Sequence, residues 1–441
     1  MPLLLGSDFG TTYFKVGLSD ERGALRSLGR VAVEKRIARP GWCELPVETF
    51  WDLLRHGLRE ALAAAAASQS DIGALSYSSQ ANTFVLLDSA DRPLTPLVIW
   101  TDTRGGAAPA EWMAFSEREA FRHTVGFGPL TPESAVCKWR WFQRQEPGLW
   151  LRVARVMTIS DYFTFAITGE PAGDAGTAAL LGLFDLRRNE WWPEALAAFG
   201  VDREKLSRPL PPGARCGTVS RTGASLLGLA TNIPYAVGGL DHQVAAVGSG
   251  LGRFADLSIS TGTVLAAVAL VDKVNGIRGC FHGPHIDGRR FYRLAFDPVG
   301  AGQLEDYRRE FARDQTIEQL VALAADPTSP GRAVREIMQR VALAQRKLVS
   351  RVAGGEKIRA IAATGGGARS SLWLQIKADI LGVPVIVPRC AERACLGAAV
   401  FAAAAAGVYR DADEAIAAMI RPDRVFEPAG GANDPAYSVK P

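Results

Sequence analysis

One pattern occurs twice in the sequence, and it restricts the fold more than any other feature. Residues 3–18 read as an apolar segment, the polar turn Asp8-Phe9-Gly10-Thr11-Thr12 and a second apolar segment. Residues 256–271 repeat this order around Thr261-Gly262-Thr263. The apolar segments have the length of β-strands, and the Gly-Thr pairs are typical of tight turns. The repeat predicts two strand–turn–strand hairpins, one at the start of each half of a duplicated architecture.

Strands and helices are expected to alternate in both halves. Further strand candidates occupy residues 84–87, 98–100, 358–362 and 383–387. Apolar residues at helical spacing predict amphipathic helices: Trp51, Leu54, Leu58 and Leu62; Ile337, Val341, Ala344 and Leu348; Leu372, Ile376 and Ile380. With 441 residues, the chain is long enough for two α/β domains with a cleft between them, predicted at residues 1–250 and 251–441.

Composition excludes several classes of protein. The net charge is +4, and no basic run or stripe of Lys and Arg suggests a nucleic-acid partner. No signal peptide and no apolar segment of about 20 residues is present, so we expect a cytoplasmic protein without a membrane partner. The six cysteines form no CxxC pair and have no His at zinc-ligand spacing. They are therefore expected to be reduced thiols, and no metal cage is built into the sequence.

The first turn has the composition of a phosphate-binding loop. Gly10 lets the backbone approach a phosphate, while the N–H and hydroxyl groups of Thr11 and Thr12 can donate to its oxygens. Asp8, at the end of a strand, can hold Mg²⁺ directly or through water. The alternative is a plain β-turn, in which Asp and Gly are simply good turn residues.

A second acidic residue follows two glycines. The apolar residues 233–237 lead into Gly238-Gly239-Leu240-Asp241, and an Ala-rich helix is expected to follow. Asp241 therefore lies at a strand end and a helix start. It can be a structural N-cap, or the general base that accepts a proton from a hydroxyl under attack on phosphate.

Three consecutive glycines, Gly365-Gly366-Gly367, lie between a predicted strand and a helix that Ser370 or Ser371 can cap. Bare backbone suits a flat adenosine or a phosphate at the helix N-terminus. A close strand–helix turn is the structural alternative, but it needs fewer glycines.

Polar side chains also follow two strands of the first half. Residues 79–83 include Gln80 and Asn82, and residues 100–104 include Trp100 and Asp102. Amides, a carboxylate and an aromatic face are typical of sites that bind sugar hydroxyls. Two polar loops with a core Trp are the alternative.

Taken in order, these segments resemble the FGGY family of carbohydrate kinases. The similarity covers roughly residues 3–300 and 358–410. In chain order, the similar motifs are Asp8 to Lys15, residues 40–44, Gln80 to Thr83, Trp100 to Arg104, Asp161-Tyr162, residues 167–170, Asp174, Gly239 to Gln243, Ser260 to Thr263, Gly365 to Ala368, Gln375, Ala378-Asp379, and Glu392 with Gly397-Ala398-Ala399. Any single motif can arise by chance, but a series of them in the right order is not expected to.

The resemblance implies a duplicated actin/Hsp70-like fold with an N-terminal sugar-binding lobe and a shortened C-terminal nucleotide-binding lobe. It implies ATP and Mg²⁺, held between the lobes, and a sugar or polyol as acceptor, for example a ketose such as xylulose. A homodimer is the commonest assembly for such enzymes. The residues with implied roles are these: Asp241 as base and sugar ligand; Asp8 at the metal; Gly10, Thr11, Thr12, Lys15, Gly262, Thr263, Gly366, Gly367, Ala368 and Ser371 at the nucleotide; Gln80, Asn82, Trp100 and Asp102 at the sugar.

Two departures from the family pattern limit what can be transferred. Xylulose kinases commonly have His, and glycerol kinases an Arg-Glu pair, where this chain has Ala81-Asn82. The region between Gln303 and Gln345 is shorter than in the family and lacks a Gly-Glu-Arg-x-Pro stretch. Because of Ala81-Asn82, neither xylulose nor glycerol can be assigned as the substrate by analogy with the family.

Two other classes of function stay open at this point. A regulator that binds sugar and nucleotide without turnover fits the shortened second half. An ATPase related to Hsp70 shares the fold, although only about thirty residues follow Gly407, too few for a client-binding domain.

Overall fold

The computed structural model describes residues 2–262, 264–326 and 329–429. By packing, the chain divides into two compact units. The first contains residues 1–248, 271–292 and 392–419, and the second contains residues 249–270, 293–391 and 420–441. The domain boundary near residue 250 stays a prediction. The compact units are not continuous in sequence, because residues 271–292 and 392–419 belong to the first unit.

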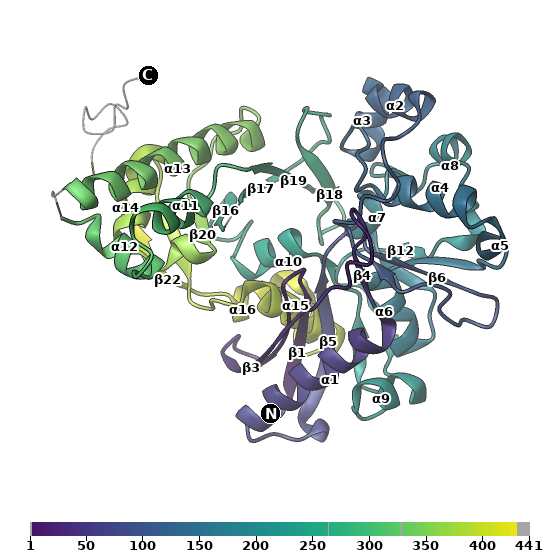
Figure 1. Cartoon of the computed structure of the whole chain (residues 1–441). Helices are drawn as coiled ribbons and strands as arrows, with labels where there is room; N and C mark the ends of the chain where they lie inside the picture. The colour runs from purple at the N-terminus through teal and green to yellow at the C-terminus, as the bar shows by residue number, and fades with distance from the viewer. Residues whose placement is uncertain (1, 263, 327–328, 430–441) are drawn as a thin grey trace. The chain divides into compact units, whose positions relative to one another are not determined.

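The first unit is built on a mixed sheet with the order β13-β14-β5-β1-β2-β3, in which β15 also pairs with β5 (Figure 1). Strands β1, β2 and β3 form an antiparallel meander, and β5 runs parallel to β1. The strands are β1 (Leu3–Phe9), β2 (Tyr13–Ser19), β3 (Leu25–Ala32), β5 (Ile72–Ser79), β13 (Arg215–Thr218), β14 (Pro234–Ala236) and β15 (Gly239–Leu240).

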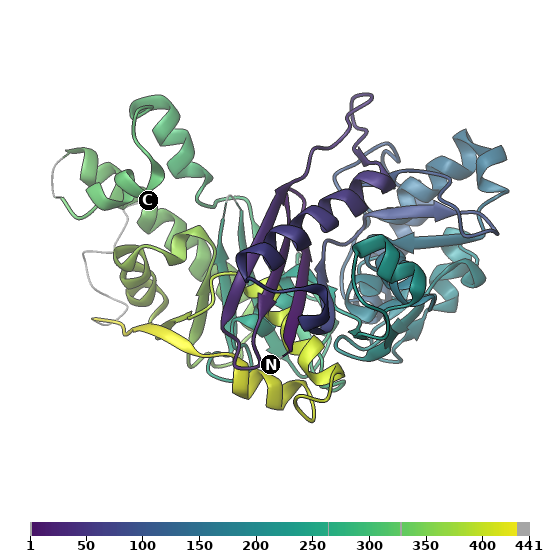
Figure 2. The same cartoon turned by 90° about the horizontal axis from the view of Figure 1, so that it is seen from below.

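Helices cover both faces of this sheet. In β2, Val16 faces Gly57 of α1 (Val47–Ala64), whereas the next residue, Gly17, faces Cys395 of α15 (Arg393–Ala405). Because neighbouring strand residues point to opposite faces, α1 and α15 lie on opposite sides of the sheet. Figure 2 shows α1 lying along these strands. Strand β1 is buried from Leu4 to Phe9, as expected for a strand that is covered on both faces.

Helix α15 packs against the sheet at very short range. A Cβ on Gly6 of β1 would lie 2.0 Å from the carbonyl oxygen of Cys395, and one on Gly397 would lie 2.1 Å from that of Val244 in α10 (Asp241–Gly248). Glycines therefore allow a strand and two helices to touch by their backbones. This contact brings residues from near the C-terminus to the N-terminal hairpin.

The rest of the first unit surrounds this core. A small sheet has the order β4-β7-β6-β8. Its strands, the short pairs and the other helices are β4 (Glu44–Leu45), β6 (Phe84–Leu87), β7 (Leu97–Val98), β8 (Arg155–Thr158), β9 (Ala172–Asp174), β10 (Phe184–Asp185), β11 (Glu190–Trp191), β12 (Arg208–Leu210), β18 (Phe281–Pro284), α2 (Ala110–Glu117), α3 (Glu119–Val125), α4 (Ala135–Gln145), α5 (Pro147–Trp150), α6 (Ile159–Thr168), α7 (Ala175–Ala179), α8 (Pro193–Phe199), α9 (Arg221–Leu227), α16 (Ala412–Met419) and two 3₁₀ turns, η1 (Gln69–Asp71) and η2 (Arg203–Lys205).

The second unit repeats the topology of the first. Its sheet has the order β19-β17-β16-β20-β21-β22, with β16 antiparallel to β17 and parallel to β20. This matches β1, β2 and β5 of the first unit. The elements are β16 (Leu257–Thr261), β17 (Leu265–Val271), β19 (Phe291–Asp297), β20 (Ile361–Thr364), β21 (Val385–Pro388), β22 (Pro422–Phe426), α11 (Gly302–Phe311), α12 (Ile317–Leu323), α13 (Ser329–Ala353), α14 (Ser371–Leu381) and the 3₁₀ turn η3 (Gly366–Ala368). The predicted duplication of the hairpin is confirmed.

Candidate active site

The first turn of the chain joins β1 to β2. Phe9 pairs with Phe14, and Asp8 with Lys15, across the antiparallel hairpin. The turn is tight at Gly10, where a Cβ would lie 2.7 Å from the carbonyl oxygen of Tyr13. Both phenylalanines are buried and anchor the hairpin in the core, while residues 10–12 are left partly or fully exposed. The predicted phosphate loop is thus a solvent-accessible turn between two buried phenylalanines.

Asp8 is a buried carboxylate surrounded by other charges. It is 9% exposed and accepts a hydrogen bond of 2.9 Å from Ser78 Oγ. Burial raises its pKa to about 6; Lys15 opposes the rise, while the charges of Asp241 and Glu392 add to it. Lys15 Nζ lies 2.7 Å from Glu392 Oε2. One lysine and three carboxylates therefore share a small region with a surplus of negative charge.

Asp241 lies at the same edge of the sheet. Gly239 of β15 and Asp8 of β1 both pair with Ser78 of β5, so the two strands flank β5 and end beside each other. Gly238 permits this approach, because a Cβ there would lie 1.8 Å from the carbonyl oxygen of Tyr77. Asp241 begins α10, is partly exposed, and accepts a 2.7 Å hydrogen bond from the N–H of His242. The carboxyl ends of three parallel strands thus present two acids, as ligand sites in α/β sheets commonly do.

Three of the predicted sugar-binding residues follow β5 and β7. Gln80 is buried, and its Oε1 accepts from Thr83 Oγ1 at 3.1 Å. Asn82 is partly exposed and accepts from the N–H of Ala135 through Oδ1 at 3.1 Å. Trp100 is 39% exposed, and its Nε1 donates to Thr11 Oγ1 at 2.8 Å. The Trp100 ring is therefore tied to the turn that follows Asp8.

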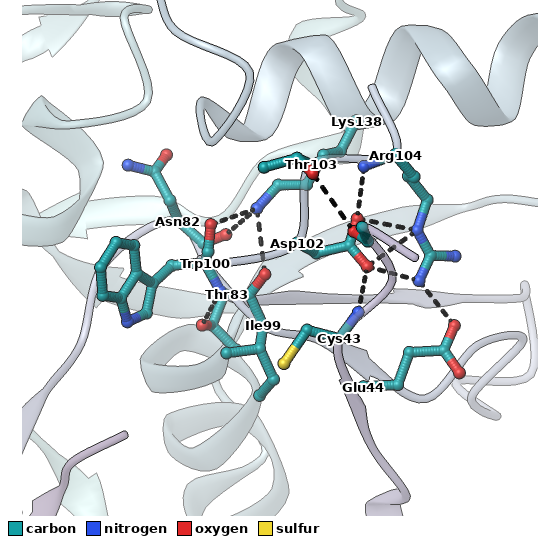
Figure 3. Close-up of polar contacts among 11 residues, drawn as sticks. Cys43, Glu44, Asn82, Thr83, Ile99, Trp100, Asp102, Thr103, Arg104 and Lys138 are labelled. Carbon is teal, nitrogen blue, oxygen red and sulfur yellow. Dashed lines mark hydrogen bonds and ion pairs between the residues drawn. The ribbon is translucent and has the colours of Figure 1, made fainter. Parts of the chain in front are cut away.

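Asp102 occupies a different environment from the other three. It is fully buried, and Arg104 Nη2 and the N–H of Cys43 donate to its Oδ2 at 2.8 and 2.6 Å. Arg104 Nε and N–H donate to Oδ1 at 2.9 and 3.0 Å, and Arg104 also reaches Glu44 Oε1 at 2.7 Å (Figure 3). The carboxylate of Asp102 is thus occupied by protein donors. Its predicted contact with sugar stays a prediction.

The second hairpin borders a pocket of about 1090 Å³ within the second unit. Thr261 and the predicted nucleotide-binding residues Gly262, Gly366 and Gly367 are among the residues that line it. Gly365 has φ +80°, and a Cβ on it would lie 2.6 Å from the carbonyl oxygen of Thr261. The three glycines therefore let η3 fold tightly over the end of β16. Thr263, also predicted at the nucleotide, lies outside the described residues.

The other two residues predicted at the nucleotide contact an arginine of β22. Arg424 donates through Nη2 to the carbonyl oxygen of Ala368 at 3.1 Å, and through Nη1 to Ser371 Oγ at 3.2 Å. Ser370 rather than Ser371 caps α14, accepting from the N–H of Trp373. Ala368 and Ser371 thus adjoin the glycines without being among the pocket-lining residues.

Sequence reasoning missed the opposite wall of this pocket. Helices α11 and α12 supply Glu305, Asp306, Arg309, Glu318 and neighbouring apolar residues. These helices lie in the segment that departs from the family pattern, so no motif marked them. With about 1090 Å³, the pocket is slightly larger than the range of about 300–1,000 Å³ that is usual for small-ligand sites.

Sequence reasoning also missed a buried lysine next to the pocket-lining residue Thr261. Lys377 of α14 is fully buried and donates to Thr261 Oγ1 at 2.8 Å. Gln345 of α13 donates to the same oxygen at 3.3 Å. Burial lowers the pKa of Lys377 to about 7. A lysine between Ile376 and Ile380 on a buried helix was the sequence signal that could have revealed it.

The described residues include no helix with the length and apolar character needed to cross a membrane. Among the same residues, no group of three or more His, Cys, Asp or Glu side chains is arranged to hold a metal ion. None of the six cysteines, all of which lie in the part of the chain that the structure describes, forms a disulfide bond.

Models of both domains of one protein family match this chain. The model of the FGGY family of carbohydrate kinases, N-terminal domain, matches residues 3–248, and that of the C-terminal domain matches residues 294–406. A xylulose kinase of Staphylococcus epidermidis is 24% identical over 97% of this chain and 92% of its own length. A glycerol kinase of Bordetella parapertussis is 26% identical over 97% and 93%.

Solved structures share the fold. A ligand-bound xylulose kinase from Lactobacillus acidophilus has a TM-score of 0.86 at 19% identity, covering 99% of this chain and 95% of its own. Glycerol kinase from Plasmodium falciparum, solved with ADP, has a TM-score of 0.83 at 17% identity, covering 97% and 94%. The two-unit actin/Hsp70-like fold predicted from the sequence is confirmed. With both family models matched in order, this chain belongs to the FGGY family of carbohydrate kinases and is a kinase that uses ATP to phosphorylate an alcohol group.

Proposed function

We propose that Asp241 is the general base of this kinase and that the acceptor is a sugar or polyol bound beside it. The main support is the position of two acids: Asp8 and Asp241 lie at the carboxyl ends of the strands that flank β5. Asp241 is partly exposed and accepts one backbone hydrogen bond, so the carboxylate has remaining lone pairs for a hydroxyl proton. Asp8 is buried and suits a charge-holding role better than proton transfer.

Other protein groups are proposed to bind the phosphates and the rest of the nucleotide. Lys15 supplies a positive charge for the phosphate oxygens, and the turn residues Gly10, Thr11 and Thr12 offer backbone and hydroxyl donors. Gly262, Gly366 and Gly367 hold the nucleotide through bare backbone beside the pocket of the second unit. Phosphoryl transfer then depends mainly on positioning and charge stabilisation.

Mg²⁺ fits the charged group formed by Asp8, Lys15, Asp241 and Glu392. Asp8, Asp241 and Glu392 outnumber Lys15 there, and their mutual repulsion contributes to the raised pKa of Asp8. A divalent cation offsets such a surplus, and Mg²⁺ commonly uses one or two carboxylates together with water and substrate phosphates. Asp8 is the residue we propose for it. The ion, when bound, neutralises charge that develops on the phosphate oxygens.

The acceptor is proposed to contact Asn82, Trp100 and Gln80 as well as Asp241. Xylulose and glycerol kinases among the relatives suggest ketoses and polyols as the first compounds to test. We also propose a cytoplasmic location, which is supported by the six cysteine thiols outside disulfide bonds. A homodimer is proposed only because that assembly is frequent among such enzymes.

The test is ADP release from MgATP with D-xylulose, L-xylulose, glycerol and gluconate, comparing the parent with Asp241→Asn. We expect one compound to stimulate turnover in the parent, and the variant to lose about 10²–10⁴-fold in kcat while its thermal unfolding is unchanged. Near-parental turnover in the variant would reject Asp241 as the base. Binding of acceptor and ATP by the parent without any turnover would favour the regulator instead.

A further inference from the structure

A single buried ammonium joins the two segments that carry the predicted sugar-binding residues. Lys138 of α4 is fully buried, and its Nζ donates to the carbonyl oxygens of Asn82, Ile99 and Trp100 at 3.0, 3.2 and 3.3 Å (Figure 3). Asn82 follows β5, whereas Ile99 and Trp100 follow β7. One side chain from a third element therefore helps to fix the positions of the two segments relative to each other, in addition to the strand pairing of Phe84 with Val98.

The same helix also fixes the side chain of Asn82. The N–H of Ala135, in the first turn of α4, donates to Asn82 Oδ1 at 3.1 Å. Because a backbone N–H can only donate, the amide must turn its oxygen toward α4 and its NH₂ group away from it. Asn82 also has φ +57°, a left-handed conformation that is uncommon for residues with a Cβ. Asn tolerates this conformation better than most residues, and the contacts from Ala135 and Lys138 hold Asn82 in it.

A second connection joins the same two segments through Thr83. The N–H of Trp100 donates to Thr83 Oγ1 at 2.9 Å, and this hydroxyl donates to Gln80 Oε1 at 3.1 Å. Thr83 is fully buried. Removing Lys138 therefore loosens the segments without cutting every link between them, which makes an intermediate effect measurable.

Lysine is a costly choice for this position if packing is its only purpose. Burial lowers the pKa of Lys138 to about 7. Replacing a buried charge with a well-packed apolar residue is often neutral or stabilising when no partner is left behind. Here three carbonyl oxygens face the ammonium, and those of Asn82 and Trp100 have no other donor among the described residues.

We propose that Lys138 is a positioning residue for the sugar, because it keeps Asn82 and Trp100 at the separation and orientation that the acceptor requires. This proposal rests on the proposed function, since it takes Asn82 and Trp100 as acceptor ligands. It adds a residue that does not itself touch the substrate: Lys138 acts through two backbone carbonyls.

The kinetic test compares Lys138→Met with Lys377→Met, two fully buried lysines of similar pKa that lie in different units. With the acceptor that supports parental turnover, we expect Lys138→Met to raise the acceptor KM about tenfold or more and to leave the KM for MgATP within about twofold. Lys377→Met should show the opposite pattern, because its ammonium contacts Thr261 beside the nucleotide pocket. An unchanged acceptor KM, or an equal rise of both KM values, in Lys138→Met would overturn the proposal.

Two further measurements keep the proposal testable if this variant folds poorly or the acceptor is not among the compounds tried. Thr83→Val removes the second connection and should also raise the acceptor KM selectively. Hydrogen exchange needs no substrate: peptides covering residues 80–83 and 99–104 should exchange faster in Lys138→Met and at the parental rate in Lys377→Met. Parental exchange in Lys138→Met would overturn the positioning role, whereas the absence of turnover in the parent would count only against the proposed function.

Discussion

Replacing Lys377 with Met should make the protein more stable at neutral and lower pH while weakening nucleotide binding. Lys377 is fully buried, and burial moves its pKa from 10.5 to about 7. At about 1.36 kcal/mol per pH unit, this difference corresponds to about 5 kcal/mol of electrostatic cost in the folded protein. Met has a similar length, no charge and no such cost.

Two favourable interactions of Lys377 offset part of that cost. A hydrogen bond from a charged donor to Thr261 Oγ1 contributes about 1.5–3 kcal/mol, and the ammonium lies 5.0 Å from the ring centroid of Trp373, a contact of about 1–2 kcal/mol. Gln345 still donates to Thr261 in the variant. We therefore expect Lys377→Met to raise the free energy of unfolding by about 1–2 kcal/mol at pH 6.

The advantage of the variant should shrink as pH rises. The folded-state pKa of Lys377 lies below its unfolded value, so the unfolded chain binds more protons between about pH 7 and 10.5. The parent is therefore stabilised with rising pH in this window, by about 1.36 kcal/mol per unit, and Lys377→Met lacks this gain. From pH 7 to 9 the difference between them should change by about 2–3 kcal/mol and reverse in sign.

Urea unfolding at pH 6, 7, 8 and 9 measures both the sign and the slope. The matched control is Lys347→Met, which removes an exposed lysine from α13 in the same unit and should shift stability little at every pH. If Lys377→Met is less stable than the parent by more than about 1 kcal/mol at pH 6, or if the difference does not change with pH, the ammonium of Lys377 is not a net cost and this reasoning is refuted.

Two other predictions concern packing in the first unit. Arg104→Met should lower the free energy of unfolding by about 3–5 kcal/mol in urea, because it leaves Asp102 buried without its paired charge; a loss under about 1 kcal/mol would contradict this. Gly397→Ala should destabilise by about 1–3 kcal/mol, since its Cβ would lie 2.1 Å from the carbonyl oxygen of Val244, whereas Gly to Ala within an unobstructed helix normally stabilises. A higher Tm for Gly397→Ala would show that α10 and α15 can separate easily.

Local signals in the sequence predicted local structure well. Apolar segments interrupted by Gly-Thr turns became the hairpins β1–β2 and β16–β17, because strand pairing across a tight turn needs little beyond neighbouring residues. The helix containing Trp51, Leu54 and Leu58 buries those residues as their spacing predicts. Predicted strand limits were less accurate: the segment at 358–362 is β20 (Ile361–Thr364), displaced toward the glycines that follow it.

Contacts between distant segments were not predictable in the same way. Residues 392–399 fall within the domain predicted at 251–441, yet α15 packs on β1, and Glu392 pairs with Lys15, 377 positions earlier. Gly6 and Gly397 allow this contact, but a glycine in a strand or helix does not reveal which backbone approaches it. Asp102 shows the same limit, because its motif marks it as polar and well placed without revealing that Arg104 and Cys43 occupy its oxygens.

The two buried lysines extend this argument from structure to function. Each interrupts an apolar helix surface, where a hydrophobic residue would pack without an electrostatic cost. Lys138 directs its ammonium to three carbonyls beside the proposed sugar site, and Lys377 to one hydroxyl beside the proposed nucleotide pocket. Lys138 is better compensated, so its removal should loosen two loops, whereas removal of Lys377 should relieve a cost. Opposite effects on stability, together with selective losses of acceptor and nucleotide binding, would distinguish positioning from packing at both sites.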